Sequence, residues 1–173
     1  PASFDQREAA KDPAQSRALA GSEDPAKIVR REDQALVYLV RDVAGDLDKI
    51  ILPIRGYGLW STMYGFMALE SDGNTVAGLG FYEHGETPGL GGEIDNPNWK
   101  AIWPGKLVYQ GNEVAIQVLK GSVPAGSADE QWQVDGLSGA TLTTKGVDKL
   151  VRYWLGEQGF KPLLENLRQG EVS

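Results

Sequence analysis

The sequence contains no cysteine and one histidine among its 173 residues. Without cysteine the chain can form neither a disulfide nor an iron–sulfur cluster, so any redox role requires a bound organic cofactor. A lone imidazole with no cysteine and no helical His-x-x-x-His pair sets no coordination geometry. We therefore expect no metal site, even though His84 lies near Glu83, Glu86 and Glu93 in the sequence.

Long apolar runs and positive charge are also scarce. Apolar runs such as residues 35–40 fall far short of the roughly 20 residues that span a bilayer. The chain has 24 acidic and 17 basic residues, a net charge of −7, and no basic cluster. This balance is typical of a solvated acidic surface, and it argues against nucleic acid as a partner.

The length suits one domain that buries roughly two-thirds of its unfolded surface. Residues 1–27 are polar, with Phe4 and Leu19 as the only large apolar side chains, and we interpret them as a lead-in to a domain at 28–173. The chain begins with Pro1 rather than methionine, which indicates a processed or truncated product, so we expect that a membrane anchor can precede it.

Strand and turn signals predict an α+β fold with a bent, mostly antiparallel sheet and packed helices. Gly78 and Gly80 share a strand face with Val76 and Tyr82, which suggests that something approaches that face closely. The elements expected from apolar periodicity and turn residues are strands at 34–41, 49–54, 66–70, 75–82, 106–109, 113–119 and 131–134, hairpin turns at 44–46 and 71–74, a loop at 122–130, and helices at 95–103, 144–155 and 161–168.

The segment 135–145, DGLSGATLTTK, precedes the clearest amphipathic helix. Gly136, Gly139 and Ala140 leave the approach to Thr141 open, which indicates that the motif gives access to one hydroxyl. Thr143 or Thr144 is the expected N-cap, and Lys145 adds positive charge to a helix start that attracts phosphate. An ordinary capped turn that feeds a packed helix explains the same residues.

The segment 55–68, RGYGLWSTMYGFMA, mixes three glycines with four aromatic residues. One interpretation is a glycine-bent strand whose aromatic side chains fill the core. The other is a platform for a planar ligand, in which Trp60 or Tyr57 packs near a ring and Ser61 and Thr62 offer hydroxyls to its polar edges or to phosphate. The sequence leaves both open.

The segment 83–93, EHGETPGLGGE, contains four glycines and a proline, so it is expected to form a shaped loop rather than a helix or strand. Its backbone amides can wrap a cofactor, and Leu90 can press against a ring. A structural connection without any ligand is the alternative.

The run from Asp135 to Thr141 resembles the flavinylation motif Asp-Gly-x-Ser/Thr-Gly-Ala-Thr of the covalent FMN-binding domains of respiratory sodium pumps, and every defined position matches. In that family the final threonine carries FMN through a phosphoester that a separate flavin transferase installs. The resemblance therefore implies that Thr141 is the attachment point.

Residues 34–169 are also similar to the NqrC proteins of sodium-translocating NADH:quinone oxidoreductases, through the segments 56–65, 86–93 and 138–143. The resemblance implies an electron-transfer subunit with an N-terminal membrane helix, which this chain lacks, and an FMN domain on the periplasmic side of the bacterial inner membrane. Electrons that originate from NADH would enter this FMN and leave to another flavin. The implied partners are the other subunits of the membrane complex and the transferase.

The resemblance implies no catalytic acid–base set, because electron transfer requires only proximity. It suggests that Lys145 offsets phosphate charge and that Trp60, Thr87, Leu90 and Thr143 tune the flavin. The full set of expected cofactor-binding residues is Thr141, Ser138, Gly139, Ala140, Leu142, Thr143, Lys145, Trp60, Ser61, Thr62, Glu86, Thr87, Gly89, Leu90 and Gly91.

Three alternatives remain open at the level of sequence. The related G subunits of ferredoxin:NAD oxidoreductase complexes share the threonine motif, although the Gly-Leu-Trp-Ser segment favours the sodium pump. A non-catalytic interaction module is the second alternative. A protein that binds a flavin or nucleotide reversibly is the third.

Overall fold

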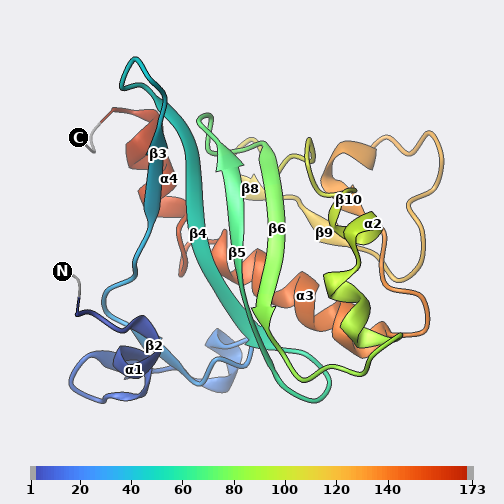
Figure 1. The fold of residues 1–173 in the computed structure, drawn as a ribbon, viewed down its shortest axis with the longest axis horizontal. Helices are drawn as coiled ribbons and strands as arrows, with labels where there is room; N and C mark the ends of the chain where they lie inside the picture. The colour runs from blue at the N-terminus through green and yellow to red at the C-terminus, as the bar shows by residue number, and fades with distance from the viewer. Residues whose placement is uncertain (1–2, 171–173) are drawn as a thin grey trace.

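The computed structural model describes residues 3–170 and confirms the expected α+β class. Its centre is a four-stranded antiparallel sheet in the order β3-β4-β5-β6. These strands are β3 (Tyr38–Arg41), β4 (Leu47–Tyr57), β5 (Thr62–Glu70) and β6 (Val76–Glu83). Figure 1 shows β4 as a long, strongly curved strand that runs the height of the sheet.

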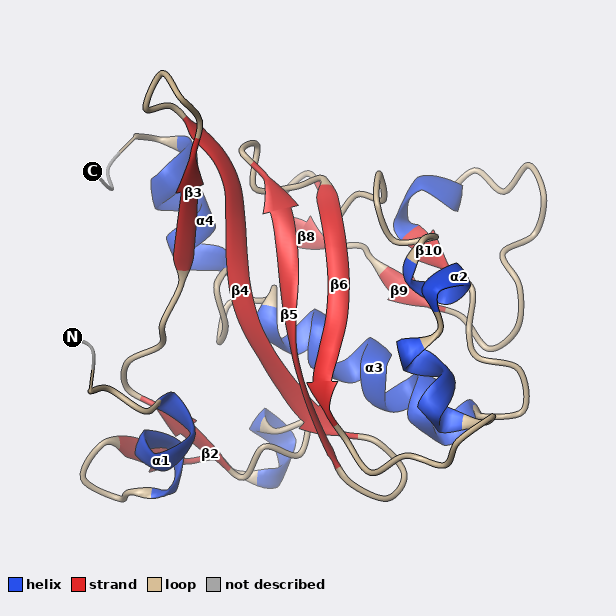
Figure 2. Cartoon of the chain, in the orientation of Figure 1, coloured by secondary structure: helices blue, strands red, loops and turns tan. Residues whose placement is uncertain are grey.

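One face of this sheet forms the core, because alternate residues of its strands point inward. Ile50 and Leu52 of β4 and Met63, Met67 and Leu69 of β5 are fully buried. Helix α3 (Thr141–Trp154) covers this face and places Val147, Leu150, Val151 and Trp154 against it. Figure 2 shows α3 crossing behind the strands, so the motif at its start lies at one end of the sheet.

The C-terminal helix α4 (Lys161–Arg168) has the bounds that the sequence predicted. It follows Phe160, whose ring stacks on Trp154 with centroids 5.4 Å apart. The Trp154 indole Nε1 donates to the carbonyl of Arg55 at 2.7 Å. The end of α3 is thereby fixed to β4.

The middle of the chain is less regular than expected. It contains η2 (Gly91–Asp95), α2 (Pro97–Lys100), β7 (Tyr109–Gln110), β8 (Glu113–Val114), β9 (Gln117–Val118), η3 (Glu130–Trp132) and β10 (Gln133–Val134). The predicted helix at 95–103 is wrong in length, because only four residues are α-helical. Trp99 and Trp103 are nevertheless buried and lie edge to face at 5.5 Å, so their spacing reflects core packing rather than a long helix.

Three further expectations are corrected. The strand predicted at 34–41 begins only at Tyr38. The segment 55–68 is not one bent strand, because β4 ends at Tyr57 and β5 begins at Thr62. A Cβ added at Gly78 or Gly80 would meet no atom within 4 Å, so nothing in the described chain approaches that face closely.

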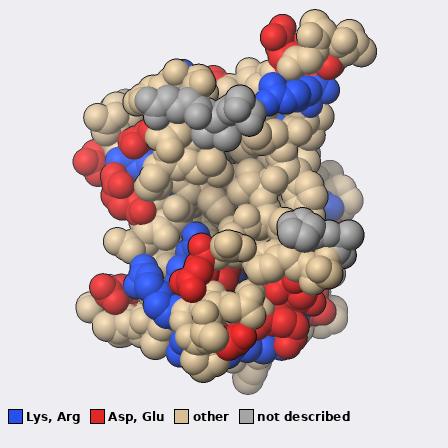
Figure 3. Space-filling view, turned by 90° about the vertical axis from the view of Figure 1, so that its left-hand side faces the viewer, with Lys and Arg blue, Asp and Glu red and all other residues tan. Residues whose placement is uncertain are grey.

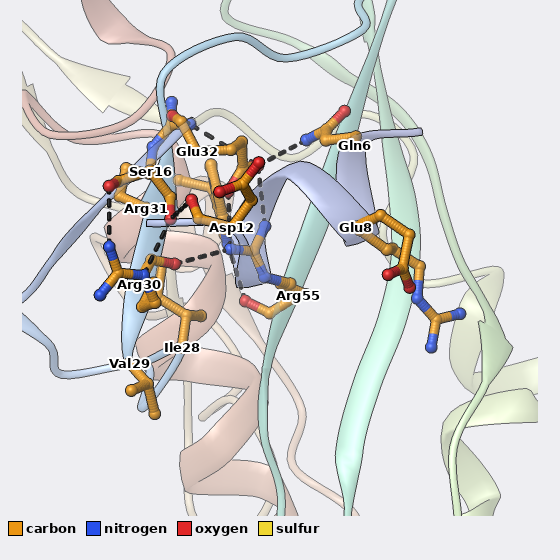
Figure 4. A network of polar contacts seen from close by, with 12 residues as sticks. Gln6, Glu8, Asp12, Ser16, Ile28, Val29, Arg30, Arg31, Glu32 and Arg55 are labelled. Atoms are coloured by element: carbon orange, nitrogen blue, oxygen red, sulfur yellow. Dashed lines mark hydrogen bonds and ion pairs between the residues drawn. The ribbon is translucent and has the colours of Figure 1, made fainter. Parts of the chain in front are cut away.

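The first 33 residues include secondary structure that packs onto the domain. Their elements are α1 (Gln6–Lys11), β1 (Ser16–Ala18), η1 (Gly21–Glu23) and β2 (Arg30–Glu32), and β1 pairs antiparallel with β2. Glu32 is 2% exposed and accepts from both terminal nitrogens of Arg55, at 2.8 and 2.6 Å. Figure 4 shows this pair within a network that joins β2 and Gln6, the first residue of α1, to β4.

In the described part of the chain, no helix is long and apolar enough to cross a membrane. On the side of the molecule shown in Figure 3, acidic and basic side chains are interspersed above and below a central hollow that uncharged residues surround.

Candidate functional site

The motif at 135–140 connects β10 to α3 and is held by neighbouring segments. The Asp135 carbonyl accepts from the Trp99 indole at 2.9 Å, and its side chain accepts from the Val123 N–H at 2.7 Å. A Cβ at Gly136 would lie 2.1 Å from the Leu119 carbonyl oxygen, so this position admits only glycine. Gly139 has φ +72°, a conformation that glycine adopts without strain.

Thr141 is the first residue of α3, and its N-cap residue Ala140 has no side-chain acceptor for the helix N–H groups. Thr141 is partly exposed, and its hydroxyl forms no hydrogen bond with any residue in the described range 3–170. Lys145 is exposed four residues later, on the same side of the helix. The helix start therefore combines a free hydroxyl, uncapped N–H groups and a nearby cation, which suits a phosphate ester.

The hydroxyls of Thr143 and Thr144 point inward, and both residues are 2% exposed. Thr143 donates to a carboxylate oxygen of Glu86 at 2.8 Å, and Thr144 accepts from the Leu137 N–H at 3.0 Å. The prediction that one of them is the N-cap is wrong, because the helix begins at Thr141. Their hydroxyls instead fix the helix to other segments.

Glu86 is the centre of a compact polar cluster and is only 5% exposed. Its carboxylate accepts from the N–H groups of Leu59, Trp60 and Ser61 at 2.7, 3.0 and 3.2 Å. It also accepts from the hydroxyls of Ser61 at 3.1 Å and Thr143 at 2.8 Å. The turn between β4 and β5, the loop after β6 and the first turn of α3 are thereby joined.

Two opposing effects act on the pKa of Glu86. Burial by itself would raise the pKa, because it disfavours the charged form. The hydrogen bonds from Leu59, Thr143, Trp60 and Ser61 favour the carboxylate and outweigh burial, so the net pKa lies below the usual value for glutamate. Glu86 is therefore ionised at neutral pH.

Glycines around this cluster leave room for the carboxylate and for the close approach of α3. A Cβ at Gly58 would lie 2.2 Å from Glu86 Oε1, and one at Gly91 would lie 2.4 Å from Thr143 Oγ1. A Cβ at Gly146, inside α3, would lie 2.6 Å from the Tyr57 carbonyl oxygen. The sequence did not predict these packing roles of Gly58 and Gly146. For Gly146 a signal was present, because a glycine within a helical pattern indicates close packing.

A groove of about 640 Å³ lies between the loop after β6 and the motif. Gly89, Leu90 and Glu93 line one side, and the segment 135–139 lines the other. A Cβ at Gly139 would lie 3.4 Å from the Leu90 side chain, so the groove is narrow at this point. Leu90, which lines the groove, is 46% exposed, and outside the groove lining Trp60 and Leu142 are 65% and 55% exposed.

The FMN-binding domain family model matches residues 58–156 of this chain. The crystal structure of Shewanella oneidensis NqrC superposes with a TM-score of 0.88 at 39% identity, over 96% of this chain and 75% of that chain. The chain belongs to the NqrC family of FMN-binding domains. Membership of the NqrC family confirms the resemblance derived from the three motifs.

The NqrC protein of the Na(+)-translocating NADH-quinone reductase of Pseudomonas aeruginosa is 60% identical over 173 residues, and that of Vibrio vulnificus is 54% identical over 174. Both alignments cover 99% of this chain but 66% of the relative. The chain thus spans just under two-thirds of the length of these NqrC relatives. A second NqrC-family crystal structure, from Parabacteroides distasonis, has a TM-score of 0.63 at 37% identity, over 74% of this chain and 61% of that chain.

The residues present fit FMN. The uncapped helix start and Lys145 suit its phosphate, and the groove is large enough for a flavin, since ligand pockets typically measure about 300–1,000 Å³. The glycine at position 139 keeps the passage beside Leu90 open. The uncapped helix start and the groove beside the motif are therefore compatible with FMN.

The other expected site residues occupy varied positions. Ser138 is exposed in the motif, whereas Thr62 pairs with Tyr57 at the start of the β4–β5 hairpin. Thr87 is exposed, and its carbonyl accepts from the N–H groups of Leu90 and Gly92 at 3.1 and 2.8 Å. Thr87 therefore shapes the loop through its backbone.

His84 supports the same loop. Its Nε2 lies 2.6 Å from a carboxylate oxygen of Asp95, and its Nδ1 accepts from the Glu86 N–H at 3.1 Å. Because Nδ1 accepts, the proton is on Nε2 in this arrangement. Within residues 3–170, no group of three or more His, Cys, Asp or Glu side chains is arranged to hold a metal ion.

Proposed function

We propose that this chain is the flavin-bearing NqrC domain of a Na+-translocating NADH:quinone oxidoreductase. FMN is bound through an ester between its phosphate and the hydroxyl of Thr141. The domain accepts electrons that originate from NADH and passes them to another flavin of the complex. The observation that carries the proposal is the free hydroxyl of Thr141 at an uncapped helix start, within a fully matched flavinylation motif.

Bound FMN supplies the electron-accepting ring, and the chain holds and shields it. The N–H groups at the start of α3 and the ammonium of Lys145 offset the charge of the phosphate. Leu90 lines the groove and presents an apolar side chain to a bound ring. An ester leaves the ring chemically unchanged, so hydrogen bonds, burial and nearby charge set its potential.

The names of the relatives support the other subunits of such a complex as partners. The NqrC proteins of P. aeruginosa and V. vulnificus are named as parts of a Na(+)-translocating reductase. We assign this domain to the periplasmic side of that membrane complex, with a membrane anchor preceding it. A separate flavin transferase forms the ester during maturation, and covalent attachment keeps the flavin from being lost to dilution.

The test is the intact mass of the protein after coexpression with a flavin transferase. We expect a mass increase of one FMN that survives denaturation, and its loss in Thr141→Ala. Ser138→Ala is the matched control, since it removes the nearest exposed hydroxyl of the same motif and should retain the adduct. An adduct that persists in Thr141→Ala contradicts the attachment point. A flavin released by denaturation indicates reversible binding instead.

A further inference from the structure

Glu86 is a buried anion without a cation partner. Its carboxylate accepts five hydrogen bonds, all from backbone N–H groups and hydroxyls. Within residues 3–170, no Lys, Arg or His side chain forms an ion pair with it. Neutral donors satisfy the oxygen atoms but leave the negative charge in place.

Two glycines leave space for the Glu86 cluster rather than for a ligand. The position of a Cβ at Gly58 is filled by the carboxylate, and that at Gly91 by the Thr143 hydroxyl. One of the two interpretations left open by the sequence assigned these glycine-bearing segments to a planar ligand. At Gly58 and Gly91 the glycines instead allow Glu86 and Thr143 to meet.

The geometry links Glu86 to both sides of the proposed flavin site. Oε2 receives the N–H of Trp60, whose side chain is 65% exposed, so the base of that indole is fixed while its ring extends outward. Oε1 receives the hydroxyl of Thr143, two residues after Thr141 in the same helical turn. The positions of Trp60 and Thr141 relative to one another therefore depend on one carboxylate.

We infer that Glu86 is a positioning residue whose ionised carboxylate holds the Trp60 turn against the start of α3, and whose uncompensated charge makes reduction of a flavin on Thr141 less favourable. This inference rests on the proposed function. It does not require that Glu86 touch the cofactor.

The direction of the electrostatic effect follows from charge. Reduction adds electrons to the flavin, so a fixed negative charge nearby disfavours it. At an effective dielectric constant of about 20, one unit charge at ~10 Å changes a one-electron equilibrium by about tenfold. Removing the charge should therefore shift the flavin potential to a more positive value.

The first experiment uses flavin-free protein, so that it stands apart from Thr141 chemistry. Amide NMR shifts of Leu59, Trp60 and Ser61 are measured in the wild type, in Glu86→Gln and in the control Glu83→Gln. Glu83 is an exposed carboxylate three residues earlier, so the same chemical change is made outside the cluster. We expect large shifts of these three amides in Glu86→Gln and none in the control. Unchanged amides would overturn the positioning role.

The second experiment titrates the flavin-loaded proteins with a chemical reductant. We expect the ratio of reduced to oxidised flavin at fixed ambient potential to rise about tenfold in Glu86→Gln, and to be unchanged in Glu83→Gln. A purely structural Glu86 would lower stability and leave the potential alone, which would overturn the electrostatic role. If wild-type protein retains no flavin after denaturation, the proposed function fails, while the amide measurement still tests positioning.

Two further variants separate the roles and serve if Glu86→Gln does not fold. Glu86→Asp keeps the charge but withdraws it from the turn, so the amide shifts should change while the potential stays near that of the wild type. Thr143→Val removes the link to α3 but keeps the charge, and the amide shifts of the flavin-free protein show whether this link holds the turn. If the ratio of reduced to oxidised flavin at fixed ambient potential rose about tenfold in Glu86→Asp, the electrostatic role would be overturned.

Discussion

Two buried carboxylates, Glu32 and Glu86, organise opposite regions of this domain in different ways. Glu32 is 2% exposed and forms a two-point ion pair with Arg55, with a further hydrogen bond from Gln6 at 2.6 Å (Figure 4). Glu86 is 5% exposed and receives only neutral donors. Both have a pKa below the ordinary value, although burial alone would raise it.

The two carboxylates differ in whether a cation compensates their charge, and this difference indicates different roles. Glu32 is compensated by Arg55 and, at 3.6 Å, by Arg31, so it fastens the N-terminal segment to β4 without leaving an uncompensated negative charge. Glu86 keeps its charge beside the helix that begins at Thr141. Burying a charge without a counterion is costly, and backbone dipoles fixed in one direction reduce that cost. An apolar residue would give stability more simply, so the charge itself is the feature that points to function.

The largest effect should come from breaking the ion pair. Arg55→Met leaves Glu32 buried without its main cation, and we expect a loss of about 3–5 kcal/mol in the free energy of unfolding. Urea unfolding measures it. The double variant Arg55→Met/Glu32→Leu should recover most of the loss, because it removes both charges together. A single variant that unfolds like the wild type would show that the pair does not hold the N-terminal segment.

Crowding the Glu86 carboxylate should have the next largest effect. In Gly58→Ala the new methyl would lie 2.2 Å from Oε1, so either the turn or the carboxylate must move. We expect a loss of about 2–3 kcal/mol from overpacking and weakened hydrogen bonds. Gly80→Ala is the matched control, because its methyl meets no atom within 4 Å and should change stability by less than about 0.5 kcal/mol. Equal losses in the two variants would contradict the packing described for this cluster.

Several features of the fold could be predicted from local signals alone. The 161–168 helix and the turns at 44–46 and 71–74 depend on residues close in the sequence. The start of α3 could not be predicted from Thr143 and Thr144, because both hydroxyls bond to distant segments instead of capping the helix. Glu86 and Thr143 are 57 positions apart, and no periodicity or spacing indicates that they meet.

The candidate site likewise contains features that depend on neighbouring residues and features that depend on distant contacts. The motif ending at Thr141 could be identified from the sequence because its positions are contiguous. The roles of Gly58 and Gly91 could not, since a glycine that admits a ligand and a glycine that admits a carboxylate look alike in a sequence. Gly78 and Gly80 show the opposite error, because glycines suggested close approach where the described chain leaves open space.

Acid should weaken both regions by protonating their carboxylates. Each has a lowered folded-state pKa, and in the unfolded chain the pKa returns to about 4.3. The stabilisation is therefore fully present above that value and is lost as the pH falls through the folded-state pKa. Each carboxylate contributes a slope of at most about 1.4 kcal/mol per pH unit.

Urea unfolding between about pH 6 and pH 3 measures these slopes. Glu32→Gln and Glu86→Gln should each reduce the slope with which the free energy of unfolding falls at acid pH. Glu83→Gln serves as the exposed control. If the free energy of unfolding of Glu86→Gln fell with acid as steeply as that of the wild type, the carboxylate would not be the ionised group assigned here.

The smallest effect should come from removing one neutral donor. Thr143→Val keeps the shape of the side chain and the charge of Glu86, but it deletes the 2.8 Å hydrogen bond between them. We expect a loss of about 1–2 kcal/mol, the range for a hydrogen bond to a charged group.

Thr75→Val is the comparison, because Thr75 donates to Asp72 at 2.6 Å in a solvent-exposed turn where water can replace it. Its loss should be smaller, since an exposed carboxylate recovers its hydration while a buried one does not. Should the exposed deletion cost as much as the buried one, desolvation would not distinguish the two carboxylates. The charge of Glu86 would then be no more consequential than one on the surface.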